Sequence, residues 1–263
     1  VDIDTGMGGR AHDVLRPSLR QQLRQRLRER RFDFGMFGGP CGTFSPLHEP
    51  QLRDVWHPEG LPRWLEAGSP WRDHVLRGTA CWDATAELAL ELWRAGGEFV
   101  IEHQQRRYVQ GKRAFWAAKA SAAVPGDLPS ILELERLTGA QRIDLAQCAC
   151  GGRFQKFSTL LCSPRIAAQL RWLGELRCER CDAFEEHEER AQGYFPDGSS
   201  RAEAAGAYPS DMCRAVAAAG LACPIEPRRD GSSDSAGEAS SDDEMPMLVD
   251  GDSDSGEDEE VDA

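Results

Sequence analysis

The chain has 263 residues, with 31 basic and 44 acidic side chains and a net charge of -13. Residues 230–263 hold 14 of the acidic side chains and no Lys or Arg, so the rest of the chain is close to neutral. No apolar run is long enough to cross a membrane, no signal-peptide pattern opens the chain, and the nine cysteines are an odd number. These features exclude a membrane-spanning protein and a disulfide framework, and they predict a soluble intracellular protein. Because the first residue is Val rather than Met, we expect further sequence upstream.

The first forty residues have the pattern of a strand, a helix and a strand. Residues 1–4 and 12–15 are predicted as short strand ends, each carrying an acidic residue. Residues 17–31 are predicted as an amphipathic helix, because leucines recur at every fourth position from Leu19 to Leu27. Residues 32–37 form a short apolar run that predicts the next strand, which indicates a parallel βαβ unit.

Residues 45–70 are rich in Pro, Gly and Trp and have no sustained periodicity, so they are predicted as a long loop. The part from Trp56 to Trp71, with Arg53, Arg63 and Arg72, suits stacking on unpaired bases and contact with phosphate. Tryptophans buried at the edge of the core are an equally good interpretation of the same residues.

The remaining elements alternate between helices and strands. Helices are predicted at 73–95, 113–123, 131–137, 166–176 and 211–219, and strands at 98–103, 142–149 and 158–162. This alternation predicts an α/β fold with a mostly parallel, Rossmann-like sheet. We expect that fold over residues 1–164, a small helical, Cys-containing subdomain over 165–223, and a disordered acidic tail over 224–263.

One run, residues 32–45, has the pattern of a strand that presents a reactive side chain. The apolar strand ends in Gly38 and Gly39, and Pro40 and Cys41 follow in a tight loop. Such a loop allows close approach of a ligand, and Cys41 would be a nucleophile where its surroundings favour the thiolate. The alternative is that Cys41 is a small buried hydrophobic residue.

Several of these segments, in this order, resemble the S-adenosylmethionine-dependent cytosine-5 DNA methyltransferases. Residues 38–45 resemble that family's Pro-Cys motif, and residues 100–103 its Glu-Asn motif, with His103 in place of Asn. Residues 150–156 lie where the family carries a Gly-x-Pro-Gln-x-Arg stretch, although the prolines and the last Arg are absent. Tyr208 to Ala219 has the position of the family's closing helix.

The resemblance implies a methyltransferase-like sheet and a role for each matched residue. Cys41 would attack carbon 6 of cytosine, and Glu102, as a protonated carboxyl at an apolar strand end, would support charge at ring nitrogen 3. Asp4 would accept the cofactor ribose hydroxyls and Asp13 the adenine amino group. Gly38 and Pro40 would lie against S-adenosylmethionine in the same loop. The expected partner is DNA, and an active protein would be nuclear.

One departure from the family concerns the cofactor. The Gly-rich loop expected before Asp4 is absent, and Met7-Gly8-Gly9 comes too late to replace it. Either the sequence was cut upstream or the domain is a degenerate copy, as occurs in polyproteins of mobile elements. A non-catalytic nucleic-acid-binding or scaffold module that keeps the fold is therefore the second hypothesis.

A partial zinc motif lies near the C-terminal end of the predicted fold. Cys178, Cys181 and His187 have the spacing of metal ligands, and Cys148, Cys150, Cys162 or an acid such as Glu185 would complete the set. The third hypothesis is a zinc-stabilised interaction domain whose acidic tail contacts basic proteins. Target sequence, the choice between DNA and RNA, and oligomeric state stay open at this point.

Overall fold

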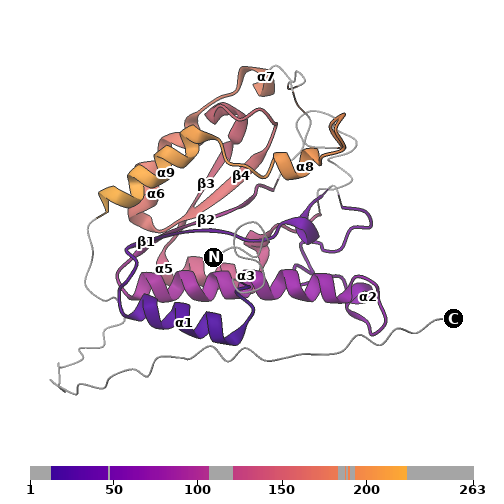
Figure 1. Ribbon diagram of the computed structural model, residues 1–263, viewed down its shortest axis with the longest axis horizontal. Coiled ribbons are helices and arrows are strands. Elements are labelled where there is room, and N and C mark those ends of the chain that lie inside the picture. The colour runs from indigo at the N-terminus through magenta and orange to yellow at the C-terminus, as the bar shows by residue number, and fades with distance from the viewer. Residues whose placement is uncertain are drawn as a thin grey trace, which may run out of the picture. The chain divides into compact units, whose positions relative to one another are not determined.

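A four-stranded mixed sheet lies at the centre of the computed structural model (Figure 1). The structure describes residues 13–46, 48–106, 121–182, 187, 189 and 193–223. The strands are β1 (Phe34–Gly38), β2 (Glu98–Gln104), β3 (Gln141–Ala146) and β4 (Phe157–Cys162). The α-helices are α1 (Pro17–Arg28), α2 (Pro62–Leu65), α3 (Arg72–Arg94), α5 (Pro129–Thr138), α6 (Pro164–Leu170), α7 (Glu179–Asp182), α8 (Arg201–Ala204) and α9 (Ser210–Ala222). The 3₁₀ turns are η2 (Gly42–Phe44), η3 (Pro125–Asp127), η4 (Gln147–Cys150) and η5 (Arg171–Glu175).

The strand order is β1-β2-β4-β3, and the prediction of a mostly parallel sheet was wrong. β1 pairs with β2 in parallel, and β4 pairs antiparallel with both β2 and β3. The physical reason is the short connection between β3 and β4. Parallel neighbours need a crossover of a dozen or more residues, whereas residues 147–156 are enough only for a return in the opposite direction. β1, β2 and β3 therefore run the same way, and β4 runs against them.

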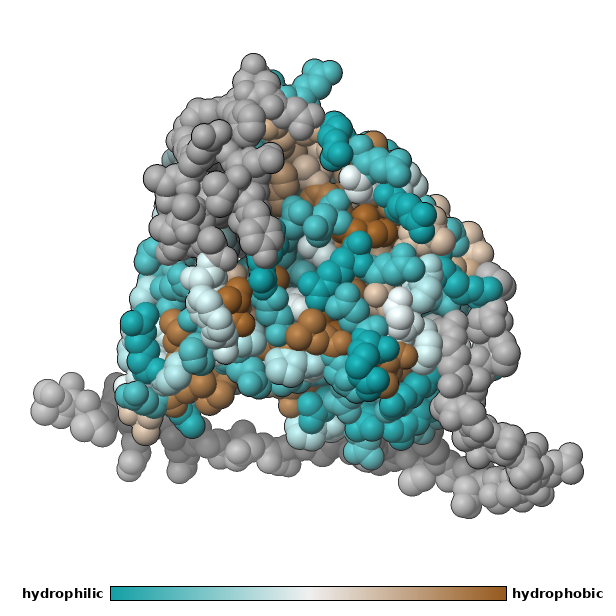
Figure 2. Space-filling model, turned by 180° about the vertical axis from the view of Figure 1, so that it is seen from behind, coloured by the Kyte–Doolittle hydropathy of each residue, from teal (hydrophilic) through white to brown (hydrophobic). Residues whose placement is uncertain are grey.

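Helices cover both faces of the sheet (Figure 1). On one face α3 packs with α1 and α5 against β2, around the fully buried residues Trp82, Phe99 and Ile101. On the other face α6 and α9 pack against β2, β3 and β4, with Val100, Met212 and Val216 buried. Alternate residues of β2 thus enter opposite cores, which is why nearly the whole strand is buried. Figure 2 shows one outer face, where hydrophobic residues stand in small separate groups among hydrophilic ones.

The end of α3 shows how the sequence places β2 beside β1. Gly96 adopts a positive φ of 95°, which favours glycine, and its N–H donates to the carbonyl of Trp93. The next N–H, of Gly97, donates to the carbonyl of Leu92, and that of Glu98 donates to the carbonyl of Asp33 just before β1. The helix therefore ends in a tight turn that delivers β2 directly into register with β1.

Most predicted helices and strands are confirmed with shifts of a few residues at their ends. The helices at 17–31, 73–95, 131–137 and 211–219 and the strands at 32–37, 98–103, 142–149 and 158–162 correspond to α1, α3, α5, α9 and β1 to β4. The predicted helix 166–176 is divided into α6 and η5, and the last residues of the predicted strand 142–149 form η4. The described part of the long loop at 45–70 includes the short α2 and isolated bridges at Asp54.

The strand predicted at 12–15 was wrong, because Asp13 to Arg16 form a turn that leads into α1. The carboxylate of Asp13 accepts the N–H of Leu15, and its carbonyl accepts that of Arg16. Residues 1–12, 107–120 and the tail from 224 lie outside the described residues, as do the strand predicted at 1–4 and most of the helix predicted at 113–123. Among the helices described, none is both long and apolar enough to cross a bilayer.

Candidate active site and metal centre

Polar side chains gather at one edge of the sheet, where β1, β2 and β3 end. Cys41 follows β1, Glu102 lies near the end of β2, and Gln147 follows β3. β4 runs the opposite way, so its beginning, at Lys156 and Ser158, reaches the same edge. The carboxyl ends of parallel strands are the usual place for ligands in open α/β sheets. This edge is therefore the candidate active site.

The carboxylate of Glu102 is the centre of this group and is only 7% exposed. Its Oε1 accepts from Ser158 Oγ at 2.5 Å and from Gln147 Nε2 at 3.4 Å, and it lies 3.6 Å from Lys156 Nζ. Its Oε2 accepts from the hydroxyl of Tyr208 at 3.1 Å. Four donors from three segments hold this side chain, so its surroundings are polar rather than the apolar strand end expected from the sequence. A buried carboxylate needs such partners.

Cys41 lies within electrostatic reach of this group. The register of the parallel pair sets Gly38 beside Glu102, and Cys41 follows three residues later. Cys41 is exposed as a residue, yet the protein atoms around its thiol partly withdraw it from water. That burial raises the pKa of the thiol, the charge of Lys156 lowers it, and the charge of Glu102 raises it. The resting group is therefore a thiol whose ionisation depends on Lys156 and Glu102.

Tyr208 joins the segment before α9 to the same site. Burial raises the pKa of its hydroxyl, and the charge of Glu102 and the hydrogen bond to it add to this effect. The hydroxyl is so close to β1 that a Cβ at Gly38 would lie 2.8 Å from it. Lys156 Nζ lies 5.3 Å from the centroid of the Tyr208 ring, a cation–π distance. Tyr208 thus stays a neutral donor to Glu102.

The loop that carries Cys41 is held from the side by Trp82 of α3. The indole Nε1 donates to the carbonyl of Pro40 at 3.0 Å. A Cβ at Gly39 would lie 2.6 Å from the indole ring, so only glycine allows this approach. A group does approach Gly39 closely, as predicted, but that group is the indole of Trp82 and not a ligand.

His103, the neighbour of Glu102 in β2, is buried. Its Nδ1 hydrogen-bonds with the carbonyl of Gln104 at 2.8 Å, and its ring lies edge-on to Trp82. Among the described residues its buried Nε2 has no hydrogen-bond partner. Burial lowers the pKa of the imidazole, so it is neutral at physiological pH.

The described residues that were predicted to bind S-adenosylmethionine contact other parts of the protein. Asp4 lies outside the described residues. Asp13 forms an ion pair with Arg77 of α3 at 2.7 Å, and the side-chain hydrogen bond from Arg77 lowers the pKa of its carboxyl. The space beside Gly38 is filled by Tyr208, and the carbonyl of Pro40 accepts from Trp82. Asp13, Gly38 and Pro40 therefore each contact another part of the protein.

The loop predicted to contact nucleic acid is divided between buried and exposed residues. Arg53 is 1% exposed and donates to the carbonyls of Val75 and Pro58, both at 2.6 Å. It is therefore an internal residue, and the prediction that it contacts phosphate was wrong. Trp56 is 74% exposed and belongs to an open pocket of about 480 Å³ lined by Trp56–Pro58, Glu59, Gly60, Pro62, Leu65 and Glu66. This pocket shares no residue with the Glu102 group.

A second cluster of functional side chains could hold a metal ion. The ligand atoms of Cys148, Cys178, Cys181 and His187 all lie within 4.8 Å of one another. Cys148 Sγ lies 3.5 Å from Cys181 Sγ, and His187 Nε2 lies 3.4 Å from the Sγ atoms of both Cys178 and Cys181. The structure thus confirms that the three predicted residues meet, and it selects Cys148 from the four candidates for the remaining place. Cys150 and Cys162 belong to the apolar core, and Glu185 lies outside the described residues.

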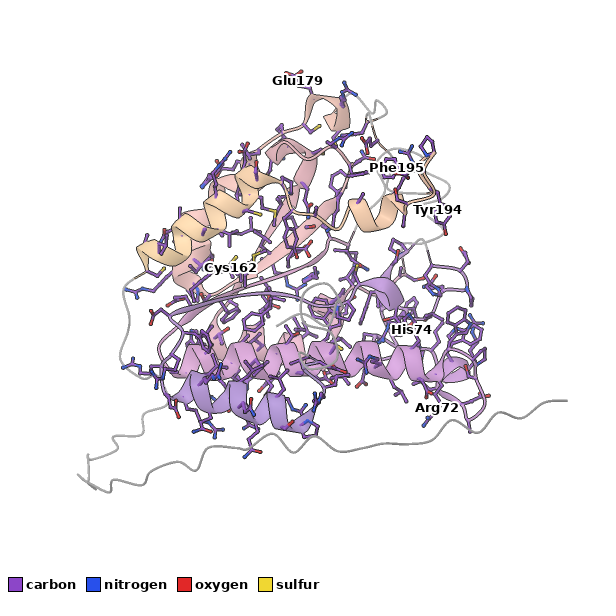
Figure 3. The ribbon with its side chains drawn as sticks, viewed as in Figure 1. Arg72, His74, Cys162, Glu179, Tyr194 and Phe195 are labelled. Carbon is purple, nitrogen blue, oxygen red and sulfur yellow. The ribbon has the colours of Figure 1, made fainter. Side chains whose placement is uncertain are left out.

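The donor set fits a tetrahedral metal. Metal–ligand bonds of about 2.3 Å to sulfur and about 2.1 Å to nitrogen give tetrahedron edges of roughly 3.5–3.8 Å between ligands. The three distances above are close to these edges. The ligands come from η4 and from the segment around α7, which Glu179 marks in Figure 3. Gln155 Nε2 donates to Cys181 Sγ at 3.5 Å, the kind of outer contact that orients a metal ligand.

Cys41 and Glu102 were both predicted from the sequence at strand ends, but the four donors to Glu102 were not. Lys156 and Tyr208 stood within segments of the family resemblance, without an assigned role. Nothing in the sequence indicated a role for Ser158 or Gln147. These residues reach Glu102 because β4 runs antiparallel to β2 and β3, which brings the start of β4 and the end of β3 to the same edge of the sheet.

Comparison of the chain with models of known protein families, with curated proteins and with solved structures gave no match.

Proposed function

We propose that the chain is a cytosine-5 methyltransferase-like protein in which Cys41 adds to carbon 6 of a cytosine in DNA. The observation that supports this most is the meeting of Cys41 and Glu102 at one sheet edge, where the charges of Glu102 and Lys156 act on the thiol. A nucleophile beside a buried carboxyl group that can exchange a proton is the arrangement that such an addition needs.

In the addition, the thiol of Cys41 gives up its proton to the carboxylate of Glu102, and the resulting thiolate forms a bond to carbon 6. The electron pair of the ring's carbon 5–carbon 6 double bond moves toward carbon 4, and that of the carbon 4–nitrogen 3 bond moves onto nitrogen 3. Glu102 is the group that holds a proton at nitrogen 3, while Ser158 and Tyr208 fix its two oxygens. Carbon 5 becomes nucleophilic, and reversal of the addition breaks the carbon–sulfur bond and restores the thiolate. The target base must leave the duplex to reach the thiol.

Methyl transfer is what the family resemblance implies for the next step. When bound, S-adenosylmethionine supplies an electrophilic methyl group. The residues at this sheet edge support the chemical steps up to the addition to carbon 6. A degenerate domain that keeps the thiol but has lost the cofactor is consistent with the same contacts.

Two assays separate these cases. Release of tritium from carbon 5 of cytosine in DNA reports the addition, because an adduct at carbon 6 makes that hydrogen exchangeable; Cys41→Ser is the control. Covalent capture on 5-fluorocytosine DNA with S-adenosylmethionine, together with a thermal shift by S-adenosylhomocysteine, reports methyl transfer. Absence of both tritium release and capture would refute the catalytic proposal and leave a non-catalytic nucleic-acid-binding or scaffold module.

We also propose that the metal held by Cys148, Cys178, Cys181 and His187 is zinc. Three thiols and one imidazole at tetrahedral spacing are the ligands of structural zinc sites. The role is structural, because the four protein ligands leave no open position for substrate. Elemental analysis of the full chain should give one zinc per chain, and Cys178→Ser should lose it while Cys223→Ser, outside the cluster, keeps it. A zinc content near zero in the unmodified chain would refute the proposal.

A further inference from the structure

We propose that the β3–β4 connection, residues 147–156, links the metal centre to the candidate active site, with Gln147 as a positioning residue for Glu102. Occupancy of the centre would then set the reactivity of Cys41. This inference goes beyond the proposed function and takes the metal centre and the Cys41 site from it.

Each end of the connection has one residue directed to the metal centre and its neighbour directed to Glu102. At the first end, Gln147 Nε2 donates to Glu102 Oε1, and the next residue is the metal-centre cysteine Cys148. At the second end, Gln155 donates to Cys181 Sγ, and the next residue, Lys156, forms the ion pair with Glu102. The same short segment therefore contacts both sites twice.

Hydrogen bonds within the connection make it a rigid unit. The N–H of Gln147 donates to the carbonyl of Lys156 at 2.8 Å, which ties the two ends together. The N–H of Gly152 donates to the carbonyl of Gln147 at 3.0 Å, and a Cβ at Gly152 would lie only 2.8 Å from that oxygen. Gln147 Nε2 also donates to Ser158 Oγ at 2.8 Å. A displacement of Cys148 is thus carried to Gln147 rather than absorbed within the turn.

The metal ion is what would hold Cys148 in place against the segment around α7. The ligands come from η4 and from the segment around α7. Among the described residues, thiol and imidazole contacts join the ligands directly, and the ion pair of Arg153 with Glu189 also joins the connection to that segment. Four metal–ligand bonds would hold the two parts together more strongly than these contacts. Loss of the metal would release η4 and with it both contacts of the connection to Glu102. A continuous element that contacts both sites can carry such coupling, and residues 147–156 provide one.

The groups that face Cys41 make the consequence measurable. The groups whose charges interact with that of Cys41 are Glu102 from β2, Lys156 from the β3–β4 connection and Tyr208 from the segment before α9. In the loaded protein Lys156 favours the thiolate. When the connection is released, Lys156 moves away from Cys41, and its positive charge no longer favours the Cys41 thiolate. Glu102 also loses Lys156 and Gln147 as donors, so its negative charge disfavours that thiolate more strongly. Alkylation of Cys41 should then be slower below the midpoint of its titration, while the plateau rate at high pH stays unchanged.

The test uses the full chain and iodoacetamide, with modification of Cys41 followed by mass spectrometry of its peptide across pH. Removal of zinc should slow alkylation of Cys41 at pH 7.5 by about tenfold for each pH unit by which the titration midpoint of its thiol rises. Added zinc should restore the original rate. Gln147→Met, which keeps the length but removes the donor, should slow alkylation in the zinc-loaded protein and reduce the further effect of zinc removal. Gln25→Met, on the exposed side of α1, is the matched control and should behave like the unmodified chain.

Equal alkylation profiles with and without zinc would overturn the inference, as would a Gln147→Met protein identical to the unmodified chain. If the zinc-free protein loses its circular-dichroism signal, the inference is judged by comparing the alkylation rates of Gln147→Met and Gln25→Met in the zinc-loaded protein. Alkylation does not require DNA or S-adenosylmethionine. Failure of this inference is therefore distinct from failure of the methyl-transfer proposal, which the tritium and capture assays test.

Discussion

Replacing Arg53 by Met should destabilise the fold, because this buried guanidinium supports the loop that follows Cys41. It donates to Thr43 Oγ1 at 3.2 Å, to Thr79 Oγ1 at 2.9 Å, and to the carbonyls of Pro58 and Val75 at 2.6 Å. Its guanidinium carbon also lies 4.0 Å from the centroid of the Phe44 ring in η2. One side chain thus joins the long loop, α3 and the turn after Cys41.

The magnitude follows from two opposing effects. Burial lowers the pKa of Arg53 to about 10, so the side chain is charged at pH 7 but its charged form is about 3 kcal/mol less favourable than in water. Hydrogen bonds from a charged donor contribute about 1.5 kcal/mol each at the lower end of the usual range, or about 6 kcal/mol for four. The net loss in Arg53→Met is therefore about 3 kcal/mol, which is roughly 6–12 °C in melting temperature for a fold of this size.

Thermal and urea unfolding of the full chain would measure this loss. Arg63→Met is the matched control from the same loop, because Arg63 is exposed, and it should change stability by less than about 0.5 kcal/mol. Arg53→Lys should recover only part of the loss, since an ammonium cannot reproduce the planar fork of donors. An Arg53→Met protein as stable as the unmodified chain, but weaker in binding DNA, would refute the reasoning and restore Arg53 as a phosphate contact.

Three further outcomes are expected. Burial is the main cause of the raised pKa of Cys41 and the charge of Glu102 adds to it, so Glu102→Gln should lower that pKa and speed iodoacetamide alkylation at pH 7.5; slower alkylation would contradict the assignment. Gly39→Ala places a Cβ 2.6 Å from Trp82 and should lower the free energy of unfolding by about 1–3 kcal/mol in urea. Because burial lowers the pKa of His103, the unfolded chain takes up its proton first, and stability should fall as pH drops below 6.5. His103→Asn should flatten that part of the pH–stability curve, and an unchanged slope would assign the acid sensitivity elsewhere.

The sequence was sufficient for local structure wherever a periodic apolar pattern was long. The 23-residue α3 and the buried strand β2 were both predictable, since Gly96 and Gly97 end the helix and an apolar run follows. Asp13 shows the limit of such reasoning. An acid next to two apolar residues has the pattern of a strand end, but its carboxylate closes a turn before α1 and pairs with Arg77, 64 residues away. No local pattern carries information about that partner.

The amino-acid sequence alone determined that Cys41 follows one apolar strand, that Glu102 lies near the end of another, and that Cys178, Cys181 and His187 are close, because short spacing and apolar strands act within a few residues of the chain. Only the tertiary structure decided the direction of β4, the choice of Cys148 as the remaining ligand, and the burial of Arg53. Each of these depends on contacts between residues far apart in the chain, which form where burial and hydrogen bonding of whole segments are jointly most favourable.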